Sequence, residues 1–311
     1  MQGGARVKIK DTFLVTSIAV LSSVLACSFL TCFFLKSPNE KLPLQEDRAF
    51  QHVLNRKELR CAYGLAGRPR FVFDNKTGKP IRGVQYDIME AIAALLHIKV
   101  TWDEVAGYGS FPENLHGHRQ DMFCSTVWES PARSHRVLLT RPLYFTPLYV
   151  LVRADDKRFD RQDYAALNRA DITFSLVDGT TPEEIAKQTF PKAKLHRHPL
   201  GGDVSQPLLD VAQGKADAAI FNLDKLVFYN KNNPEHKLKA VKGLAPVRIY
   251  GESFALDIQE WKLREMINSA ILELIQSGTL AQILQKYHDD FGGAYYLPAL
   301  PYKASKEETL L

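Results

Sequence analysis

Residues 125–133 contain the side chains best suited to chemistry. Ser130 is a favoured N-cap residue and Pro131 suits the first helical position, so we predict that a helix begins here, with Arg133 in its first turn. A cation in that turn opposes the helix dipole, at a cost of about 0.3–1 kcal/mol, where a capping box would place Glu or Gln. Free backbone N–H groups and a guanidinium together suit a planar carboxylate. The alternative is an arginine that bends into solvent.

The composition narrows the classes of function. The chain has 311 residues, of which 45% are hydrophobic and 24% are charged, enough for two modest domains. The net charge is +5 without a basic run, so we expect no nucleic-acid partner. None of the four cysteines has zinc or CxxC spacing, and no hydrolase-like nucleophile–base pattern is present. We therefore expect no catalytic residue, no metal and no cofactor.

The N-terminus predicts a membrane segment. Residues 13–35 carry no charge, a run of about 23 residues that could span a bilayer. Basic residues precede this run, which places the N-terminus in the cytoplasm and the rest outside. We predict an uncleaved signal-anchor over 1–36, because a cleaved signal has a shorter apolar core of about 7–15 residues. Residues 37–56 are polar and predict a tether followed by a short helix.

Two other fates of this segment remain open. A cleaved signal would release the protein on the outer side of the membrane. Alternatively Cys27, at the end of a short stretch resembling a bacterial lipobox, would be lipidated. The residues that follow Cys27 stay apolar, whereas a mature lipoprotein normally turns polar at this point.

Strand and helix patterns must position residues 125–133. Strand and helix signals alternate twice, first over 59–153 and again from 172. Thr181, followed by Pro and two Glu, predicts an N-cap with a capping box. Residues 136–139 are expected to close the helix that holds Arg133. Predicted strands are 59–63, 71–73, 98–102, 121–126, 148–153, 172–177, 194–198, 216–221 and 254–256.

Two cysteines fall in these predicted strands. Cys61 and Cys124 would be able to pair if their strands are neighbours. Buried free cysteines are common in protein cores, and we expect two free thiols here.

The segments together resemble a known family. Residues 57–291 are similar to the family 3 extracellular solute-binding proteins, the receptors of polar amino-acid ABC transporters. Six short segments carry the resemblance in the family's order. They are Gly78-Lys79 with Gly83 and Asp87-Ile88, Ser130-Pro131-Ala132-Arg133, Thr140-Arg141-Pro142-Leu143-Tyr144, Asp178-Gly179-Thr180-Thr181, Gly214-Lys215-Ala216-Asp217-Ala218, and Ser277-Gly278-Thr279-Leu280 with Lys286-Tyr287.

The resemblance implies an α/β architecture of the type II periplasmic-binding-protein kind. Each of two lobes would be a mixed sheet flanked by helices. The one N-terminal transmembrane helix predicted above from the uncharged run would precede them. Two crossover strands would join the lobes and let them close on a ligand. Lobe 1 would comprise 57–153 and 250–291, lobe 2 would comprise 154–249, and 292–311 would be a tail.

The resemblance also implies a ligand site between the lobes. Arg133 would bind the ligand carboxylate, and a loop at 125–128 would supply backbone polar groups. Asn222 stands where amino-acid receptors have an Asp for the ligand ammonium, although it could instead cap a helix. The full set of expected ligand-binding residues is Arg133, Trp128, Ser125, Thr126, Gly179, Thr180, Thr181, Asn222, Asp224, Phe71 and Tyr108. Trp128 could instead be ordinary packing, and Phe71 and Tyr108 are candidate walls.

We therefore expect a monomeric, membrane-anchored solute-binding protein on the periplasmic side of a bacterial inner membrane. It would pass a small carboxylate, amino-acid-like ligand to an ABC transporter permease and would not be an enzyme. One alternative is an enzyme, because cyclohexadienyl dehydratases resemble the same family and would need a general acid such as Glu129 or Asp224. Another is a ligand sensor or assembly protein, since a fixed anchor suits a protein that stays in place.

Overall fold

The computed structural model describes residues 47–65, 69–160, 163–199, 205–241 and 245–299. All of them belong to the second of two units, 1–46 and 47–311. The predicted membrane segment 13–35 and Cys27 lie outside the described residues. Among the helices that are described, none is both long enough and apolar enough to cross a membrane.

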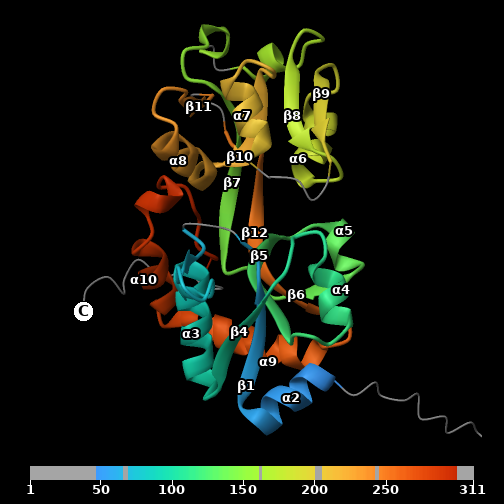
Figure 1. The fold of residues 1–311 in the computed structure, drawn as a ribbon, viewed down its shortest axis with the longest axis vertical. Helices are drawn as coiled ribbons and strands as arrows, with labels where there is room; N and C mark the ends of the chain where they lie inside the picture. The colour runs from blue at the N-terminus through green and yellow to red at the C-terminus, as the bar shows by residue number, and fades with distance from the viewer. Residues whose placement is uncertain (1–46, 66–68, 161–162, 200–204, 242–244, 300–311) are drawn as a thin grey trace, which may run out of the picture. The chain divides into compact units, whose positions relative to one another are not determined.

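The described chain alternates strands and helices (Figure 1). The helices are α2 (Arg48–Arg56), α3 (Val84–Leu96), α4 (Phe111–His116), α5 (Pro131–Ser134), α6 (Thr181–Thr189), α7 (Gln206–Ala212), α8 (Leu223–Asn232), α9 (Trp261–Gln276) and α10 (Thr279–Gln285), with 3₁₀ turns η1 (Lys157–Phe159), η2 (Tyr164–Leu167) and η3 (Asp289–Phe291). The strands are β1 (Glu58–Tyr63), β2 (Val72–Phe73), β3 (Pro80–Arg82), β4 (Lys99–Val105), β5 (Met122–Trp128), β6 (Val137–Leu139), β7 (Tyr144–Arg153), β8 (Thr173–Val177), β9 (Lys194–His198), β10 (Ala218–Asn222), β11 (Leu238–Ala240) and β12 (Arg248–Asp257).

Two long strands connect the two halves of the main sheet. Its order is β4-β1-β5-β12-β7-β10-β8-β9, with β6 beside β12 and β11 beside β7. β12 and β7 run antiparallel, from Arg248 opposite Leu148 to Glu252 opposite Tyr144, and Figure 1 shows them side by side. Towards its other end, β12 pairs with β5 and β6, while β7 pairs with β10 and β11. The polypeptide therefore crosses between the halves twice, within one hydrogen-bonded sheet.

Each half has its own apolar core, and we call the halves lobe 1 and lobe 2. Lobe 1 contains α2–α5, α9, α10, η3 and β1–β6, with one cluster under α3, α9 and α10 and another around Phe111 and Phe123. Lobe 2 contains α6–α8 and β8–β11, with one cluster beside α6 and another beside α7 and α8. Apolar residues cover both faces of the central strands, as in β5, where six of seven residues are buried. The mixed sheet flanked by helices agrees with the expected fold class.

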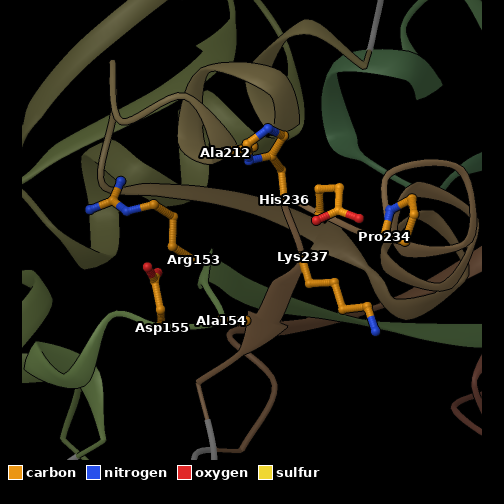
Figure 2. A pocket seen from close by; sticks show the side chains of 8 residues that line it. Arg153, Ala154, Asp155, Ala212, Pro234, His236 and Lys237 are labelled. Atoms are coloured by element: carbon orange, nitrogen blue, oxygen red, sulfur yellow. The ribbon is translucent and has the colours of Figure 1, made fainter.

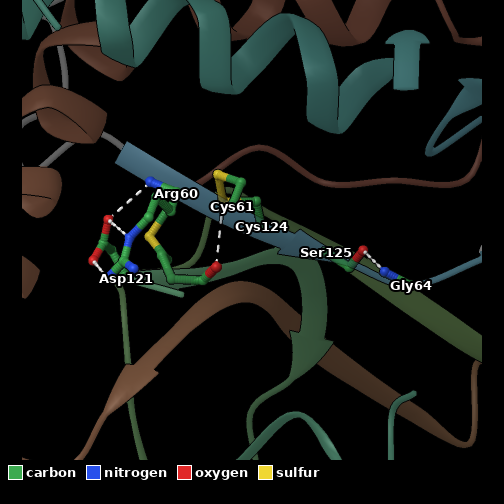
Figure 3. The surroundings of a disulfide bond; sticks show 7 residues. Arg60, Cys61, Gly64, Asp121, Cys124 and Ser125 are labelled. Carbon is green, nitrogen blue, oxygen red and sulfur yellow. Dashed lines mark hydrogen bonds and ion pairs between the residues drawn. A yellow bond between two sulfur atoms is a disulfide. The ribbon is translucent and has the colours of Figure 1, made fainter. Parts of the chain in front are cut away.

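The prediction of two free thiols in lobe 1 is wrong. Cys61 and Cys124 form a disulfide between β1 and β5, with their Cα atoms 5.5 Å apart (Figure 3). The two strands are parallel neighbours, with Cys61 opposite Met122. Sequence patterns predicted both strands but not their order in the sheet, so they could not decide between a disulfide and two thiols.

Three local predictions also need correction. Residues 125–128, expected as a loop, complete β5, because β12 supplies pairing partners as far as Trp128. Residues 136–139 do not extend the preceding helix, since β6 pairs with β12 instead. At α6 the N-cap is Thr180 rather than Thr181, and its side chain donates to the Val177 carbonyl, so the expected capping box does not form.

Candidate functional site

Arg133 lies where the sequence predicted. Ser130 is the N-cap of α5, its hydroxyl oxygen accepts from the Arg133 backbone N–H at 3.4 Å, and Pro131 begins the helix. The half-buried guanidinium donates to the Trp128 carbonyl, with Nη1 2.6 Å from the oxygen. Arg133 has no carboxylate partner among the ion pairs of the described residues. Burial lowers the pKa of Arg133, although Glu252 and Tyr108 act against that shift. Arg133 is therefore a desolvated cation that has no directly bound anion among the described residues.

A buried glutamate on the crossover strand accepts hydrogen bonds from three side chains. Glu252 is 1% exposed. Its Oε1 accepts from Trp128 Nε1 at 2.9 Å, from Thr146 Oγ1 at 2.8 Å and from Arg70 Nη2 at 3.2 Å. The Trp128 ring also stacks on Tyr250, with centroids 5.8 Å apart. Trp128 is thus held by packing and by a hydrogen bond, beside the carbonyl that Arg133 contacts.

A buried ion pair joins the lobes. Arg70 of lobe 1, between β1 and β2, donates through Nη1 to Oδ2 of Asp224 at 2.5 Å, in the first turn of α8 in lobe 2. Both side chains are almost fully buried. Burial alone would lower the pKa of Arg70, but Asp224 and Glu252 outweigh it and hold the pKa well above its ordinary value. Two carboxylates therefore keep this cation charged inside the protein.

Two polar atoms at the same end of β10 are buried and have no hydrogen-bond partner within the described part of the chain. Asn222 Nδ2 and Asp224 Oδ1 make no hydrogen bond with any described residue, and their residues are only 3% and 2% exposed. Asn222 occupies the N-cap position of α8, yet its side chain does not cap the helix. Buried polar atoms are normally satisfied, so this donor and this acceptor are suited to a water or a ligand.

The turn before α6 is stabilised by hydrogen bonds within lobe 2. Gly179 has φ +67°, and its N–H donates to Oε2 of Glu183 at 2.8 Å. Thr181 is buried. The exposed Glu184 of the first turn interacts electrostatically with Arg133. Glu184 of α6 thus lies near Arg133. The backbone N–H of Gly179, by contrast, already donates to Glu183.

The remaining predicted residues lie in different surroundings. Ser125 Oγ accepts from the Gly64 N–H at 2.8 Å (Figure 3), and Thr126 Oγ1 accepts from Gln85 Nε2 at 2.5 Å, so both hydroxyls have partners within lobe 1. The Tyr108 phenol interacts electrostatically with Arg70, Glu252 and Arg133, which places it beside this group. Phe71 was expected as a wall, but it is 1% exposed and packs against Phe73 and Trp102 in the core of lobe 1.

Neither of the two cavities described in the structure is lined by Arg133. The larger, of about 260 Å³, lies in lobe 2 and is lined by none of the predicted residues. Figure 2 shows Arg153, Asp155, His236 and Lys237 around it, and Arg153 is already bonded to Asp156. The smaller, of about 100 Å³, reaches Asp224 between α8 and η3. That volume would hold a few waters at about 30 Å³ each.

Arg70 and Glu252 are the members of this group that the sequence did not reveal. Neither residue stands in one of the motifs that carried the resemblance. Arg70 is buried, and the ion partners that justify burying it are 154 and 182 residues away in the sequence. The one available signal for Glu252 was a carboxylate just before the apolar run 254–256 of a predicted strand.

Comparison with known proteins identifies proteins that are similar to this chain. The family model described as bacterial extracellular solute-binding proteins, family 3, matches residues 62–290. A curated relative is the probable amino-acid-binding protein YxeM of Bacillus subtilis (strain 168). It is 23% identical over 229 residues, which cover 71% of this chain and 81% of that protein.

Solved structures share the fold at low sequence identity. The substrate-binding protein of an amino-acid ABC transporter has a TM-score of 0.59 and 23% identity, covering 75% of this chain and 99% of that one. The ancestral amino-acid-binding protein AncCDT-1, a precursor of cyclohexadienyl dehydratase, has a TM-score of 0.63 and 22% identity. It covers 76% of this chain and 97% of its own. These similarities support the two-lobe fold.

Proposed function

The chain belongs to the bacterial extracellular solute-binding proteins of family 3, and from that premise we propose that it captures a small carboxylate, amino-acid-like ligand for an ABC transporter. The observation that carries the proposal is Arg133, a half-buried guanidinium bonded to a carbonyl and to no carboxylate of the described chain. A ligand carboxylate would supply the missing anion through charge-assisted hydrogen bonds, each worth about 1.5–3 kcal/mol.

The other expected site residues have unequal support. Trp128 and Tyr108 lie with Arg133 and would border the ligand. Gly179, Thr180 and Thr181 would face it from lobe 2, since Glu184 of the same turn interacts with Arg133. Ser125 and Thr126 would act indirectly, because their hydroxyls already have partners.

The partner of Asp224 limits the ligand class. Asp224 is paired with Arg70, so a ligand ammonium would have to displace a guanidinium from it. Asn222 Nδ2 is a neutral donor without a described partner, and it would suit a second ligand oxygen better than an ammonium. We therefore favour a carboxylate whose second polar group accepts hydrogen bonds over a standard α-amino acid.

The proposed location rests on the family, on the disulfide and on the sequence. Members of the family are extracellular, and a disulfide such as Cys61–Cys124 persists in an oxidising compartment. The uncharged run 13–35 would anchor the protein to the membrane as a signal-anchor. The tether predicted over 37–56, whose last residues form α2 and pack on lobe 1, would then carry the lobes, divided as 57–153 with 250–291 and 154–249, next to a permease.

Calorimetry tests the carboxylate site. The purified full chain would be titrated with a panel of amino acids, dicarboxylates and hydroxy acids, and then with the cognate ligand using Arg133→Ala. We expect the variant to lose at least 100-fold in affinity, because about 3 kcal/mol of charge-assisted binding disappears.

Arg136→Ala is the matched control, because Arg136 lies three residues away, is exposed and pairs with Glu113 outside this group. It should bind the ligand as the wild type does. Unchanged affinity in Arg133→Ala would exclude this arginine from the site.

An enzyme on the same fold is the second candidate, raised by the similarity to a precursor of cyclohexadienyl dehydratase. Such an enzyme needs a general acid near the ligand. Glu129 accepts from the Ser253 hydroxyl at 3.0 Å, and Asp224 is engaged by Arg70. Turnover of prephenate or arogenate by the purified protein, lost in Glu129→Gln, would establish the enzyme and replace the receptor proposal.

A further inference from the structure

Two histidines and an aspartate come together in lobe 2, away from the group around Arg133. β9 is the terminal strand of the sheet, and His196 and His198 lie two residues apart on it. Successive strand residues point to opposite faces, so the two imidazoles share one face. Arg197, between them, points to the other face, where it binds Glu183 of α6.

The third member comes from the helix that covers this face. Asp210 of α7 is 1% exposed, and its Oδ2 lies 2.6 Å from His198 Nε2 and 3.5 Å from His196 Nε2. The potential ligand atoms of the three residues all lie within 4.8 Å of one another. Donors at 2.0–2.1 Å from a tetrahedral ion are about 3.3 Å apart. Small side-chain rotations would therefore place all three around one metal.

From this geometry we propose that His196, His198 and Asp210 form a Zn²⁺ site that fastens the edge strand β9 to α7. Two imidazoles and a carboxylate are a donor set that zinc prefers. The side chain of His196 is 51% exposed, which leaves the fourth position open to water. The site is independent of the proposed ligand function, because none of its residues contacts the group around Arg133.

Hydrogen bonds from neighbouring side chains already orient the Asp210 carboxylate. Asp210 Oδ2 accepts from Ser175 Oγ at 2.7 Å, and Oδ1 accepts from Gln206 Nε2 at 3.2 Å. Such outer partners fix the direction of a ligating oxygen and add to metal affinity. Their presence on both oxygens of a buried aspartate favours a preformed site over a chance contact.

A hydrolytic triad does not explain the same residues. Ser175 Oγ lies 3.1 Å from His198 Nε2, the nitrogen that also contacts Asp210. A triad requires the serine and the aspartate to bind opposite ring nitrogens, so that the imidazole passes a proton between them. Here Ser175 and Asp210 both contact Nε2 of His198. This arrangement suits a metal-binding position, and it gives the imidazole no route to pass a proton from the serine to the aspartate.

We expected no metal from the cysteine spacings alone, and this cluster contains no cysteine. A His-x-His pair on a strand is a weak signal by itself. The aspartate that completes the set lies 12 residues after His198, and only the packing of α7 on β9 brings it near.

The test is metal titration of the untagged full chain in detergent after removal of metals with a chelator. We expect one equivalent of Zn²⁺ to bind, and Co²⁺ in its place to give the visible absorption of a tetrahedral centre. His196→Ala and His198→Ala should each weaken binding by more than about 100-fold, because losing an outer partner alone costs about 10–100-fold. Ser175→Ala should fall in that smaller range.

His116→Ala is the control, since His116 is an exposed histidine that contacts an aspartate, Asp257, in lobe 1. It should bind Zn²⁺ as the wild type does. Circular dichroism of each variant would establish that lobe 2 is folded before metal is added. Absence of a Co²⁺ spectrum in the wild type, or equal Zn²⁺ affinity in His116→Ala and the two variants of β9, would overturn the proposal.

Discussion

At the scale of single residues, Glu183 determines the shape of the turn that precedes α6. Its Oε2 accepts the N–H of Gly179, and its Oε1 accepts from Arg197 at 2.7 Å and lies 2.7 Å from Lys187 Nζ. Gly179 has a positive φ, which a residue with a side chain adopts only under strain. One carboxylate thus holds a glycine turn, the first turn of α6 and β9 together.

We predict that Glu183→Gln destabilises the protein in a pH-dependent way. Hydrogen bonds from Lys187 and Arg197 lower the pKa of Glu183 to about 2, against about 4.3 in an unfolded chain. The carboxylate therefore stabilises the fold above pH 4.3, and this contribution disappears as the pH falls towards about 2. We expect a loss of about 2 kcal/mol at pH 7, since the exposed ends of both cations are screened.

Urea unfolding between pH 7 and pH 2.5 measures this effect. The free energies of unfolding of wild type and Glu183→Gln should converge as the pH falls. Glu184→Gln is the control, because Glu184 is exposed and adjacent, and it should change stability by less than about 0.5 kcal/mol. A constant difference between wild type and Glu183→Gln at every pH would contradict the assigned pKa.

Local chemistry made some residues predictable. Ser130 and Pro131 place Arg133 by rules that act within four residues, and the structure follows them. Arg70 and Glu252 could not be found in this way, because their burial depends on each other and on Asp224. These three groups meet only after the lobes have formed. The candidate site was thus predictable at its cation and unpredictable at the network beside it.

At the scale of elements, β1 and β5 form a covalently linked pair at the centre of lobe 1. The disulfide joins residues 63 apart in sequence and lies within the apolar cluster under α3 and α9. Strand patterns predicted both strands to within about two residues. The neighbour order that decides the disulfide is a property of the whole sheet and was not available from either pattern.

We expect removal of this disulfide to cost about 2–5 kcal/mol, because the unfolded chain regains the freedom of a long loop. Cys61→Ala/Cys124→Ala should therefore unfold at lower urea concentration than the wild type. Addition of dithiothreitol should destabilise the wild type and leave the double variant unchanged. The protein would also be alkylated without reductant and analysed by mass spectrometry. An alkyl group on both Cys61 and Cys124 would contradict the pairing.

The termini of elements were the least predictable features. β5 continues to Trp128 because β12 supplies partners there, and 137–139 become β6 for the same reason. The N-cap of α6 lies one residue before the predicted one. For β5 and β6 a partner from a distant part of the chain decided where the element begins or ends, whereas the contact made by the α6 N-cap is local, from Thr180 to the Val177 carbonyl.

At the scale of the whole described unit, the Arg70–Asp224 pair is a contact that ties lobe 1 to lobe 2. Removing one partner of a buried ion pair typically costs about 3–5 kcal/mol, because the other charge stays desolvated. Arg70→Met would leave both Asp224 and Glu252 without their cation. We therefore predict that Arg70→Met is strongly destabilising and that adding Asp224→Asn recovers part of the loss.

A double-mutant cycle measured by urea unfolding tests this coupling, with small-angle scattering to follow the separation of the lobes. The exposed pair Arg169–Asp171 is the matched control, and its coupling should stay below about 1 kcal/mol. A loss in the double variant equal to the sum of the losses in Arg70→Met and Asp224→Asn would show that the inter-lobe pair contributes no coupling energy.

The last described segment of the chain returns to the crossover strands. Tyr296 exchanges backbone hydrogen bonds with Phe145 of β7, at 2.8 and 2.9 Å, beside the stretch where β7 meets β12. If one lobe rotates about those strands, the Phe145–Tyr296 bridge must either move with it or break. An environment-sensitive fluorophore attached near Tyr296 would consequently serve as a readout for screening unknown metabolites.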